Sequence, residues 1–214
     1  MHMGESALAD TGRTFGLSGA ALKWIAMITM LIDHIGAVVM EYGLYYQGGA
    51  ETFRRLLDSG NGQWLYTFQR LMRMVGRPSF LLYSFLLVEG FFHTRSRKRY
   101  TFQMLLFALI SEIPFDLAAS NRWFYLGYQN VFFEFLIGLT AVLWGMEQAV
   151  LFGKTPLTVE AGKIFAVALG CMAAVFIHAD YDYIGIIIIA AFYEFHASRA
   201  GRSLSAAVLG GLET

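Results

Sequence analysis

Six long apolar runs divide this sequence and limit what it can fold into. They cover residues 21–42, 74–93, 101–120, 130–151, 162–179 and 183–198. A helix of roughly 20 mostly apolar residues is long enough to cross the hydrocarbon core of a bilayer. Only 15% of the residues are charged, against about 25% in soluble domains. The composition excludes a soluble enzyme, and the sequence predicts an all-α, polytopic membrane bundle of about six transmembrane helices.

The last run, YIGIIIIAAFYEFHA, is short, and its isoleucines would also suit a buried strand. An open strand in a bilayer would leave backbone groups unpaired, so a helix is the better prediction. Residues 1–17 are polar and lack the features of a signal peptide. We assign them as an N-terminal tail, residues 18–199 as the transmembrane domain and residues 200–214 as a C-terminal tail.

The distribution of Lys and Arg predicts that both termini lie in the cytoplasm. With six spans, more of these residues fall on the side of the termini than on the other side, and the run RSRKRY is the strongest marker. The predicted location is therefore the inner (cytoplasmic) membrane, in many passes. Sixteen basic and sixteen acidic residues balance, so net charge gives no reason to expect a nucleic-acid partner.

Ionisable side chains inside the spans are the main functional signal. Each costs roughly 2.5–3.5 kcal/mol on insertion scales, and such residues commonly mark substrate, ion or proton pathways. The pair Asp33-His34 lies past the middle of the first run. Further polar residues fall at the same end of their spans: Arg77, Glu112, Asp116, Asn130, Glu134, His178, Asp180 and Asp182. Five spans thus bring polar groups to the outer half of the membrane.

Spacing groups some of these residues further. Glu112 and Asp116 are four positions apart and share one helix face, and so do Asn130 and Glu134. Structural roles also fit individual residues. Arg77 can form a structural ion pair, and Glu134 near a helix start can compensate the helix dipole.

Interfacial positions offer a plain explanation for three more residues. His178 and Asp180 can be ordinary loop residues at the membrane surface. His196, at the inner end of the last run, is predicted to be interfacial. A pair such as Asp33-His34 in the middle of an apolar run has no comparable structural explanation.

A second polar group lies at the cytoplasmic end of the second run. Glu89 and His93 are four apart and precede the basic residues of positions 95–99. The basic run serves topology and contact with anionic lipid. It can also hold the phosphates of a nucleotide-bearing donor through charge-assisted hydrogen bonds. No metal is expected.

Five stretches carry a family resemblance. They are IDHIG, RMVGRPSFLLYSFLLVEGFFHTRSRKRY, FALISEIPFDLA, NVFFEFLIGL and ADYDYIGI. In this order they resemble the TraX family, known for the conjugal-transfer protein that acetylates pilin at its N-terminus. The resemblance covers about residues 18–195. The family's motifs fall on Asp33-His34, Gly76-Arg77, Glu89-Gly90, the basic run 95–99 and Ser111–Phe115.

One departure concerns the end of the chain. Family members usually continue into a further apolar segment that ends near a Tyr-Pro-x-His pattern. This sequence stops at SLSAAVLGGLET. Either the protein is shorter or that segment is missing here, and the contribution of a last helix stays open.

The resemblance implies a membrane acyltransferase. It would move an acetyl group from cytoplasmic acetyl-CoA to an amine or hydroxyl at the outer half of the membrane, on pilin or another acceptor protein, an envelope glycan or a lipid headgroup. His34 would act as a base or as a transient acetyl carrier. Asp33 would orient His34 or pair with Arg77. Either Arg77 or Asn130 would stabilise the negative charge that develops on the thioester carbonyl.

These roles define three predicted groups of site residues. The catalytic group is His34, Asp33, Arg77 and Glu112. The substrate-binding group is Asp116, Asn130, Glu134, His178 and Asp180. The donor-binding group is Glu89, His93, Arg95, Arg97, Lys98 and Arg99. The rise from the inner end of the first run to His34 is about 20 Å, which the pantetheine arm of CoA can cover.

Two other functions fit parts of the pattern. A proton-coupled small-molecule transporter is the alternative, because carriers also use intramembrane Asp, Glu and His. Carriers often have paired halves, and no repeat relates the halves of this sequence. A non-catalytic scaffold would have no use for so many ionisable groups in the outer half.

Overall fold

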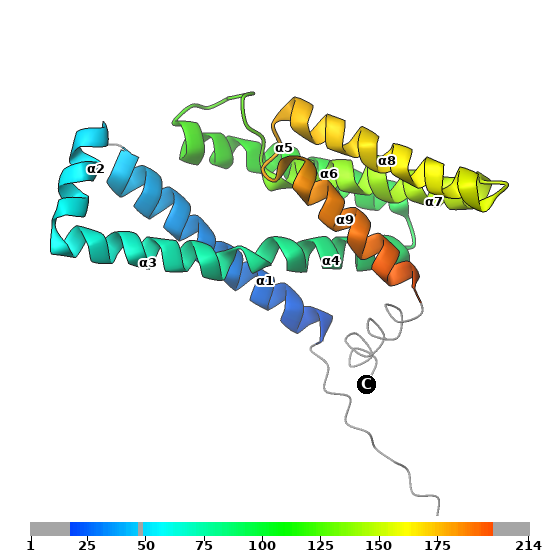
Figure 1. Cartoon of the computed structure of the whole chain (residues 1–214), viewed down its shortest axis with the longest axis horizontal. Coiled ribbons are helices and arrows are strands. Elements are labelled where there is room, and N and C mark those ends of the chain that lie inside the picture. Colours follow the sequence, from blue (N-terminus) through cyan, green and yellow to red (C-terminus); the bar gives the residue numbers. More distant parts are fainter. Residues whose placement is uncertain (1–17, 47–48, 199–214) are drawn as a thin grey trace, which may run out of the picture.

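The computed structural model describes residues 18–46 and 49–198, and the regular elements in these ranges are all helical (Figure 1). In chain order they are α1 (Gly19–His34), η1 (Ile35–Tyr46), α2 (Gly49–Asp58), α3 (Gly60–Gly76), α4 (Pro78–His93), α5 (Arg97–Ser120), α6 (Val131–Ile137), η2 (Gly138–Trp144), α7 (Gly145–Phe152), α8 (Pro156–Ile177) and α9 (Asp182–Ala197). The two η elements are π-helical segments. The predicted all-α class is confirmed. Both predicted tails lie outside the described residues.

Local sequence fixes where several helices begin. Ser18, Ser96 and Thr155 each accept a backbone N–H at the start of α1, α5 and α8. A hydroxyl in this position satisfies a donor that has no partner within the helix. Pro78 and Pro156 occupy the first turns of α4 and α8, where the fixed backbone angle of proline suits a helix.

Five helical segments are long and apolar enough to cross a bilayer. They are Gly19–Met40, Gly60–His93, Arg97–Ser120, Val131–Phe152 and Pro156–Ile177. The chain therefore has the helices of a multi-pass membrane protein. The sixth predicted run does form a helix, α9, but its 16 residues rise only about 24 Å. Five membrane-spanning helices are thus supported within the described residues, against the six that the sequence predicts.

The helices alternate between two ends of the bundle. The end that holds Gly19 and the basic run 95–99 is called the basic end. The opposite end, called the far end, holds the loop of residues 121–130 and the turn of residues 178–181. Figure 1 shows α3 and α4 nearly in line, with α1 crossing this line. Helices α7 and α8 lie above it in this view, and α9 runs from the end of α8 down to the end of α4.

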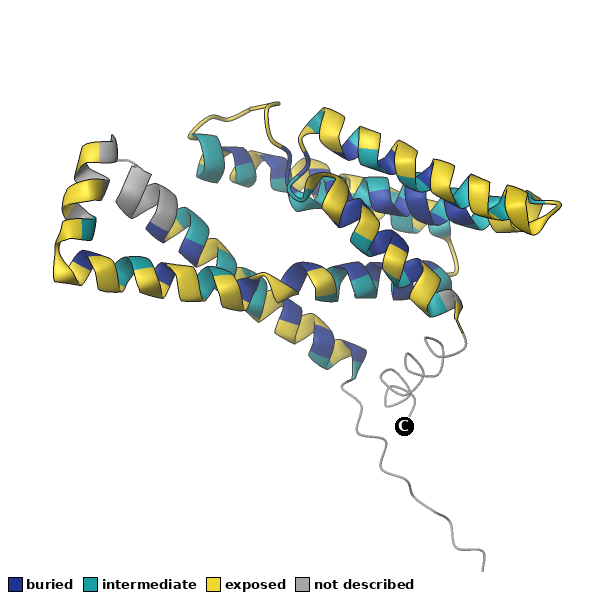
Figure 2. Ribbon diagram, in the orientation of Figure 1, coloured by how far each residue is buried: buried dark blue, intermediate teal, exposed yellow. Residues whose placement is uncertain are grey.

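The apolar core lies among α4, η2, α7, α8 and α9. Leu139 and Leu143 of η2 belong to one buried cluster with Ile186 and Ile189 of α9 and Phe91 of α4. Outward-facing positions are exposed along α3 and α8 (Figure 2). Their apolar side chains suit contact with lipid rather than with water.

Helix α5 presents its polar side to the rest of the protein. Its buried residues are Ala108, Glu112 and Asp116, spaced four apart, whereas Leu109 and Ile110 are more than half exposed. In a bilayer this arrangement places apolar side chains in lipid and carboxylates against protein. The polar stripe on α5 therefore has to be matched by groups on α6 and the far-end loop.

Helices α1 and α3 approach each other closely at Gly76. A Cβ atom at this position would lie 2.2 Å from the Cβ and 2.7 Å from the Cα of Asp33. Real Cβ atoms do not approach other atoms so closely, and the atoms of Asp33 involved cannot rotate away. The absence of a side chain at Gly76 is what allows Asp33 to lie against α3.

We expect Gly76→Ala to destabilise the protein by about 1–3 kcal/mol, because the added methyl group overpacks the crossing of α1 and α3. The apparent melting temperature of the purified protein in detergent measures this. Gly60→Ala is the matched control, since a Cβ there meets nothing within 4 Å. Equal melting temperatures for the two variants would contradict the close crossing.

Candidate functional site

Asp33 forms an ion pair with Arg73, which links α1 to α3. The sequence suggested Arg77 as the partner, and that pairing was wrong. Helix α3 extends to Gly76, so Arg73 lies on the helix face that meets α1. The predicted second span began at residue 74 and left Arg73 outside it. Arg77 is exposed at the junction of α3 and α4, and its charge acts on Asp33 only from a longer distance.

His34 has a defined arrangement of its ring nitrogens. Its Nδ1 lies 2.8 Å from the carbonyl oxygen of Met30. A carbonyl only accepts hydrogen bonds, so Nδ1 carries the proton and donates it to Met30. The neutral ring then has its lone pair on Nε2. This nitrogen is available to take a proton from another molecule.

The helix changes its hydrogen bonding directly after His34. Residues 35–46 form the π-helical segment η1. Such segments are rare and are frequent at functional sites. The change occurs beside the two polar residues that the sequence singled out, Asp33 and His34.

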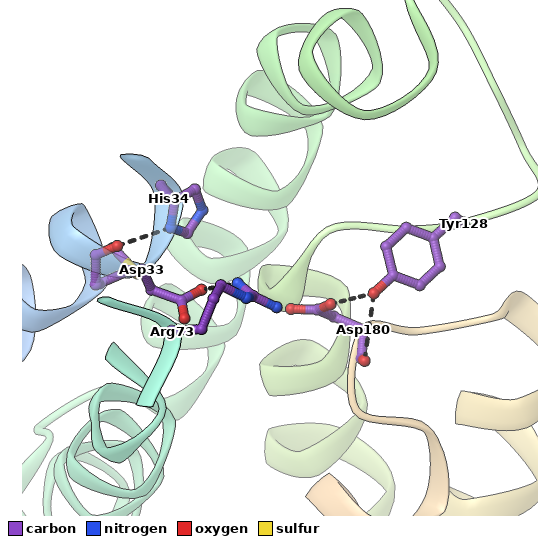
Figure 3. A network of polar contacts seen from close by, with 6 residues as sticks. Asp33, His34, Arg73, Tyr128 and Asp180 are labelled. Atoms are coloured by element: carbon purple, nitrogen blue, oxygen red, sulfur yellow. Dashed lines mark hydrogen bonds and ion pairs between the residues drawn. The ribbon is translucent and has the colours of Figure 1, made fainter. Parts of the chain in front are cut away.

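The turn between α8 and α9 brings Asp180 to the same place. The hydroxyl of Tyr128 donates a hydrogen bond to the Asp180 carboxylate. The backbone N–H of Gln129 donates to the carbonyl of His178 at 3.0 Å, so the turn is fastened to the loop of residues 121–130. Figure 3 shows the Arg73 guanidinium lying between the carboxylates of Asp33 and Asp180. We call this group of residues, with His34, the far-end cluster.

Burial changes the acid–base behaviour of this turn. It raises the pKa of Asp180 above the usual range for an aspartate, and the Tyr128 hydrogen bond offsets this only in part. Burial also raises the pKa of Tyr181 to about 12. Tyr181 therefore stays neutral at physiological pH, and its ring stacks on Phe80 at a centroid distance of 3.8 Å.

His178 enters the loop contact through its backbone. The residue is exposed and has a φ of 54°, and its carbonyl oxygen accepts the hydrogen bond from Gln129. The structure thus places His178 two residues from Asp180. Its predicted role in substrate binding stays a prediction.

Glu112 and Asn130 hold the far ends of α5 and α6 together. The Asn130 backbone N–H donates to Glu112 Oε2 at 3.3 Å, and the Asn130 side-chain amide donates to the same oxygen. The amide also donates to the carbonyl of Ala108 at 2.9 Å. Both donors of the Asn130 amide are therefore used within the protein. Glu112 lies in this contact, and its predicted catalytic role stays a prediction.

Glu134 is fully buried at the start of α6. Its Oε2 accepts a hydrogen bond from the Tyr181 backbone N–H at 3.3 Å. A Cβ at Gly185 would lie 2.5 Å from Glu134 Oε1, so this glycine of α9 makes room for the carboxyl group. Glu134 therefore positions the turn that carries Asp180.

Asp116 is also almost completely buried, with 1% of its surface exposed. Its Oδ2 accepts a hydrogen bond from the backbone N–H of Tyr125 at 2.7 Å. Within the described residues, Oδ1 of Asp116 and Oε1 of both Glu112 and Glu134 have no hydrogen-bond partner. Such buried acceptors are rare in proteins and call for an explanation at each position.

The basic end holds a second set of contacts. Glu89 pairs with His196 at 2.8 Å and lies 3.6 Å from His93. His196 was predicted to be interfacial, but it is largely buried and joins α9 to α4. Arg97 pairs with Glu147 of α7 and lies over the ring of Phe91. These residues therefore have partners inside the protein.

Three residues of the basic run remain available for an anionic group. Arg95, Lys98 and Arg99 are exposed. Across residues 18–46 and 49–198, the structure gives their side chains no hydrogen bond or ion pair. These three cations suit the phosphates of a nucleotide-bearing donor, whereas Arg97 is already paired. No group of three or more potential metal ligands is gathered within the described residues.

Sequence reasoning missed three residues that build the far-end cluster and its surroundings: Arg73, Tyr128 and Gly185. Arg73 could have been found from the sequence. It lies four positions before Arg77, and residues four apart share one face of a helix. Tyr128 and Gly185 are brought near Asp180 and Glu134 only by the packing of α5, α8 and α9, which no local pattern reveals.

The fold and the far-end cluster define a class, namely multi-pass helical membrane proteins that gather ionisable side chains from several segments at one end. The family described as TraX protein matches residues 18–211, and the chain belongs to this family. The resemblance seen in the five sequence stretches is confirmed.

One curated relative is similar to much of the chain. It is a probable fimbrial assembly protein, FimC of serogroup H1, from Dichelobacter nodosus. The two are 31% identical over 138 residues, which cover 61% of this chain and 48% of the relative. The match thus spans about half the length of that protein. No solved structure matches the chain.

We expect Arg73→Gln to destabilise the protein by about 1–3 kcal/mol, because Asp33 then lies in a span without its partner. Fully buried pairs lose about 3–5 kcal/mol when one partner is removed. The loss is smaller here because the side chains of Arg73 and Asp33 are 34% and 17% exposed. Thermal unfolding in detergent measures the effect.

Arg77→Gln is the matched control and should change stability by less than about 0.5 kcal/mol. Adding Asp33→Asn to Arg73→Gln should restore part of the lost stability, since the unpaired charge is then removed. A larger loss for Arg77→Gln than for Arg73→Gln would show that the pairing described here is wrong.

Proposed function

We propose that the protein is a membrane acyltransferase that moves an acetyl group from acetyl-CoA to an amine or hydroxyl group of an acceptor. The TraX family is associated with pilin acetylation, which supports the reaction type. The observation that carries the proposal is the hydrogen bond from His34 Nδ1 to Met30. It leaves Nε2 as a base beside the charged groups of the far-end cluster.

His34 takes part in both halves of the transfer. As the acceptor nitrogen or oxygen attacks the thioester carbonyl, Nε2 of His34 takes the acceptor's proton. The new C–N or C–O bond forms, and the C–S bond breaks. The imidazolium then returns the proton to the departing sulfur of CoA. Protons and bonds balance without a further reactant.

Asp33 and Asp180 supply the negative charges of the far-end cluster, to which His34 also belongs. The charges of Asp33 and of Asp180 both interact favourably with that of His34. Arg73 pairs with the carboxylate of Asp33, and the hydroxyl of Tyr128 holds the carboxylate of Asp180. His34 is exposed, and fixed charges near a developing charge need little rearrangement during a reaction.

Arg77 is the residue that we assign to the developing oxyanion. Sequence reasoning left Arg77 and Asn130 as alternatives for this role. The amide of Asn130 is used by Glu112 and Ala108. In the described part of the chain, the guanidinium of Arg77 has no hydrogen bond or ion pair, so it is free to donate to a thioester oxygen.

The donor is proposed to bind at the basic end. Arg95, Lys98 and Arg99 would hold the phosphates of CoA on the cytoplasmic side of the inner membrane, where both termini would also lie. Helix α1 begins at Gly19, and the rise from there to His34 is about 22 Å. The pantetheine arm therefore has to reach well into the bundle.

The acceptor is proposed to be an amine on a pilin-type subunit. The curated relative is described as a probable fimbrial assembly protein, which favours a protein acceptor over an envelope glycan. The substrate would approach the far-end cluster, where Asp180 and Tyr128 are partly or fully accessible. Its amine would lie near Asp180 before it transfers its proton to His34.

We expect His34→Ala and His34→Gln to lower acetyl transfer by about 10²–10⁴-fold, the usual contribution of a general base. The purified full chain in proteoliposomes would receive radiolabelled acetyl-CoA and a synthetic peptide with a free amino terminus. Label in the peptide is the readout, and an N-terminally blocked peptide measures the background.

Cys171→Ala is the control, since the only thiol of the chain should not carry the acetyl group. Full activity in His34→Ala would overturn the role of His34. If the native protein transfers no label but moves protons across the vesicle membrane with a solute, the transporter alternative replaces the acyltransferase.

Replacement of Arg95, Lys98 and Arg99 by Gln should raise the KM for acetyl-CoA by about tenfold or more, with little change in kcat. The reason is that phosphate contacts are lost while the far-end cluster is unchanged. Lys154→Gln is the control, since Lys154 is exposed at the same end of the bundle. If the triple variant keeps its KM for acetyl-CoA but inserts into the membrane in the inverted orientation, the basic run sets topology and does not bind the donor.

A further inference from the structure

A cavity of about 480 Å³ lies at the far end of α5, beside the far-end cluster. Its walls are formed by Phe115, Asp116, Ala119, Ser120, Arg122, Tyr125 and Tyr128. A volume of this size suits a small molecule or the headgroup of a larger one. The cavity is thus a candidate binding site that the acyl-transfer chemistry does not use.

The cavity combines a buried carboxylate with aromatic walls. Asp116 has 1% of its surface exposed, and its Oδ1 has no hydrogen-bond partner within the described residues. The rings of Phe115 and Tyr128 stack at a centroid distance of 5.5 Å. An ammonium group satisfies both features, because it donates hydrogen bonds to a carboxylate and is attracted to aromatic faces.

A positive charge lies at the edge of the same cavity. Arg122 is exposed, and its guanidinium lies over the Tyr125 ring, 5.5 Å from the centroid. No ion pair engages it within the described residues. Arg122 is therefore suited to a phosphate. The cavity presents a carboxylate inside and a guanidinium outside, which matches a zwitterion with its ammonium innermost.

The segment next to the cavity is strongly apolar. Trp123, Phe124 and Leu126 are 75%, 69% and 72% exposed. Together with Arg122 and Tyr125 they form a loop at the end of a membrane-spanning helix. Exposed aromatic residues at this height are typical of the interface between lipid headgroups and acyl chains. The ligand therefore has acyl chains next to its charged groups.

We propose that this cavity binds the headgroup of a zwitterionic phospholipid that carries a primary ammonium, as phosphatidylethanolamine does. The ammonium approaches the carboxyl group of Asp116, which forms part of the cavity wall with Phe115 and Tyr128. The phosphate contacts Arg122, and the acyl chains lie along Trp123 and Leu126. The site borders the far-end cluster at Tyr128, and lipid binding there does not depend on the proposed function.

The test compares two lipids that share a phosphate but differ in the ammonium. The purified full chain in detergent is titrated with phosphatidylethanolamine or phosphatidylglycerol, and native mass spectrometry measures each dissociation constant. We expect phosphatidylethanolamine to bind about tenfold or more tightly, the usual weight of a charge-assisted hydrogen bond. Equal affinity for the two lipids would overturn the proposal.

Variants locate the preference in the cavity. Asp116→Asn should abolish the preference while its amide oxygen still accepts from Tyr125, and Arg122→Gln should weaken both lipids. Asp58→Asn and Arg54→Gln, at exposed positions on α2, should change neither. Ala119→Leu fills the cavity and should also abolish the preference, so the test survives if Asp116→Asn fails to fold. A preference that persists in both cavity variants contradicts the assignment.

Two competitors exclude other occupants. Soluble glycerophosphoethanolamine should bind at least tenfold more weakly than the lipid, because it lacks the acyl chains. A tripeptide with a free amino terminus should not displace the lipid any better than its acetylated form. Displacement by the free peptide alone would instead make Asp116 part of an acceptor site, and equal binding of the soluble headgroup would exclude a lipid site.

Discussion

The ion pair between Asp33 and Arg73 is the interaction on which the arrangement of the far end depends. A charged side chain inside a membrane span has to find an opposite charge or leave the lipid. Asp33 meets this requirement only because Gly76 lets α1 touch α3. The next residue is His34, and η1 begins directly after it.

The far-end cluster is assembled from segments that are distant in the sequence. Helix α1 supplies His34, α3 supplies Arg73, and the turn after α8 supplies Asp180. Glu134 fixes that turn through the backbone of Tyr181. The segments are held by contacts of their own: the ion pair fixes α1 on α3, whereas Glu134 and Tyr128 fix the turn.

Much of the fold could be predicted because the apolar runs state directly which segments become helices. The polar end of the bundle was also predictable, since Asp33, Glu112 and Glu134 lie at matching depths in their runs. Partner choice was not predictable from local pattern. The partner of Asp33 is Arg73 rather than Arg77, because α3 begins further toward the N-terminus than the apolar run indicates. His196 proved to be a partner of Glu89 because α9 packs in parallel with α4, which depends on tertiary structure.

The polar stripe of α5 has a consequence for how the chain enters the bilayer during synthesis. Inserted alone, α5 would expose Glu112 and Asp116 to acyl chains, at roughly 2.5–3.5 kcal/mol for each charged group. The groups that shield them come later in the chain: Asn130 is 18 residues after Glu112, and Tyr125 is 9 residues after Asp116. Biogenesis is therefore favoured when the translocation machinery releases α5 and α6 into lipid together, as a preformed hairpin, rather than one helix after the other.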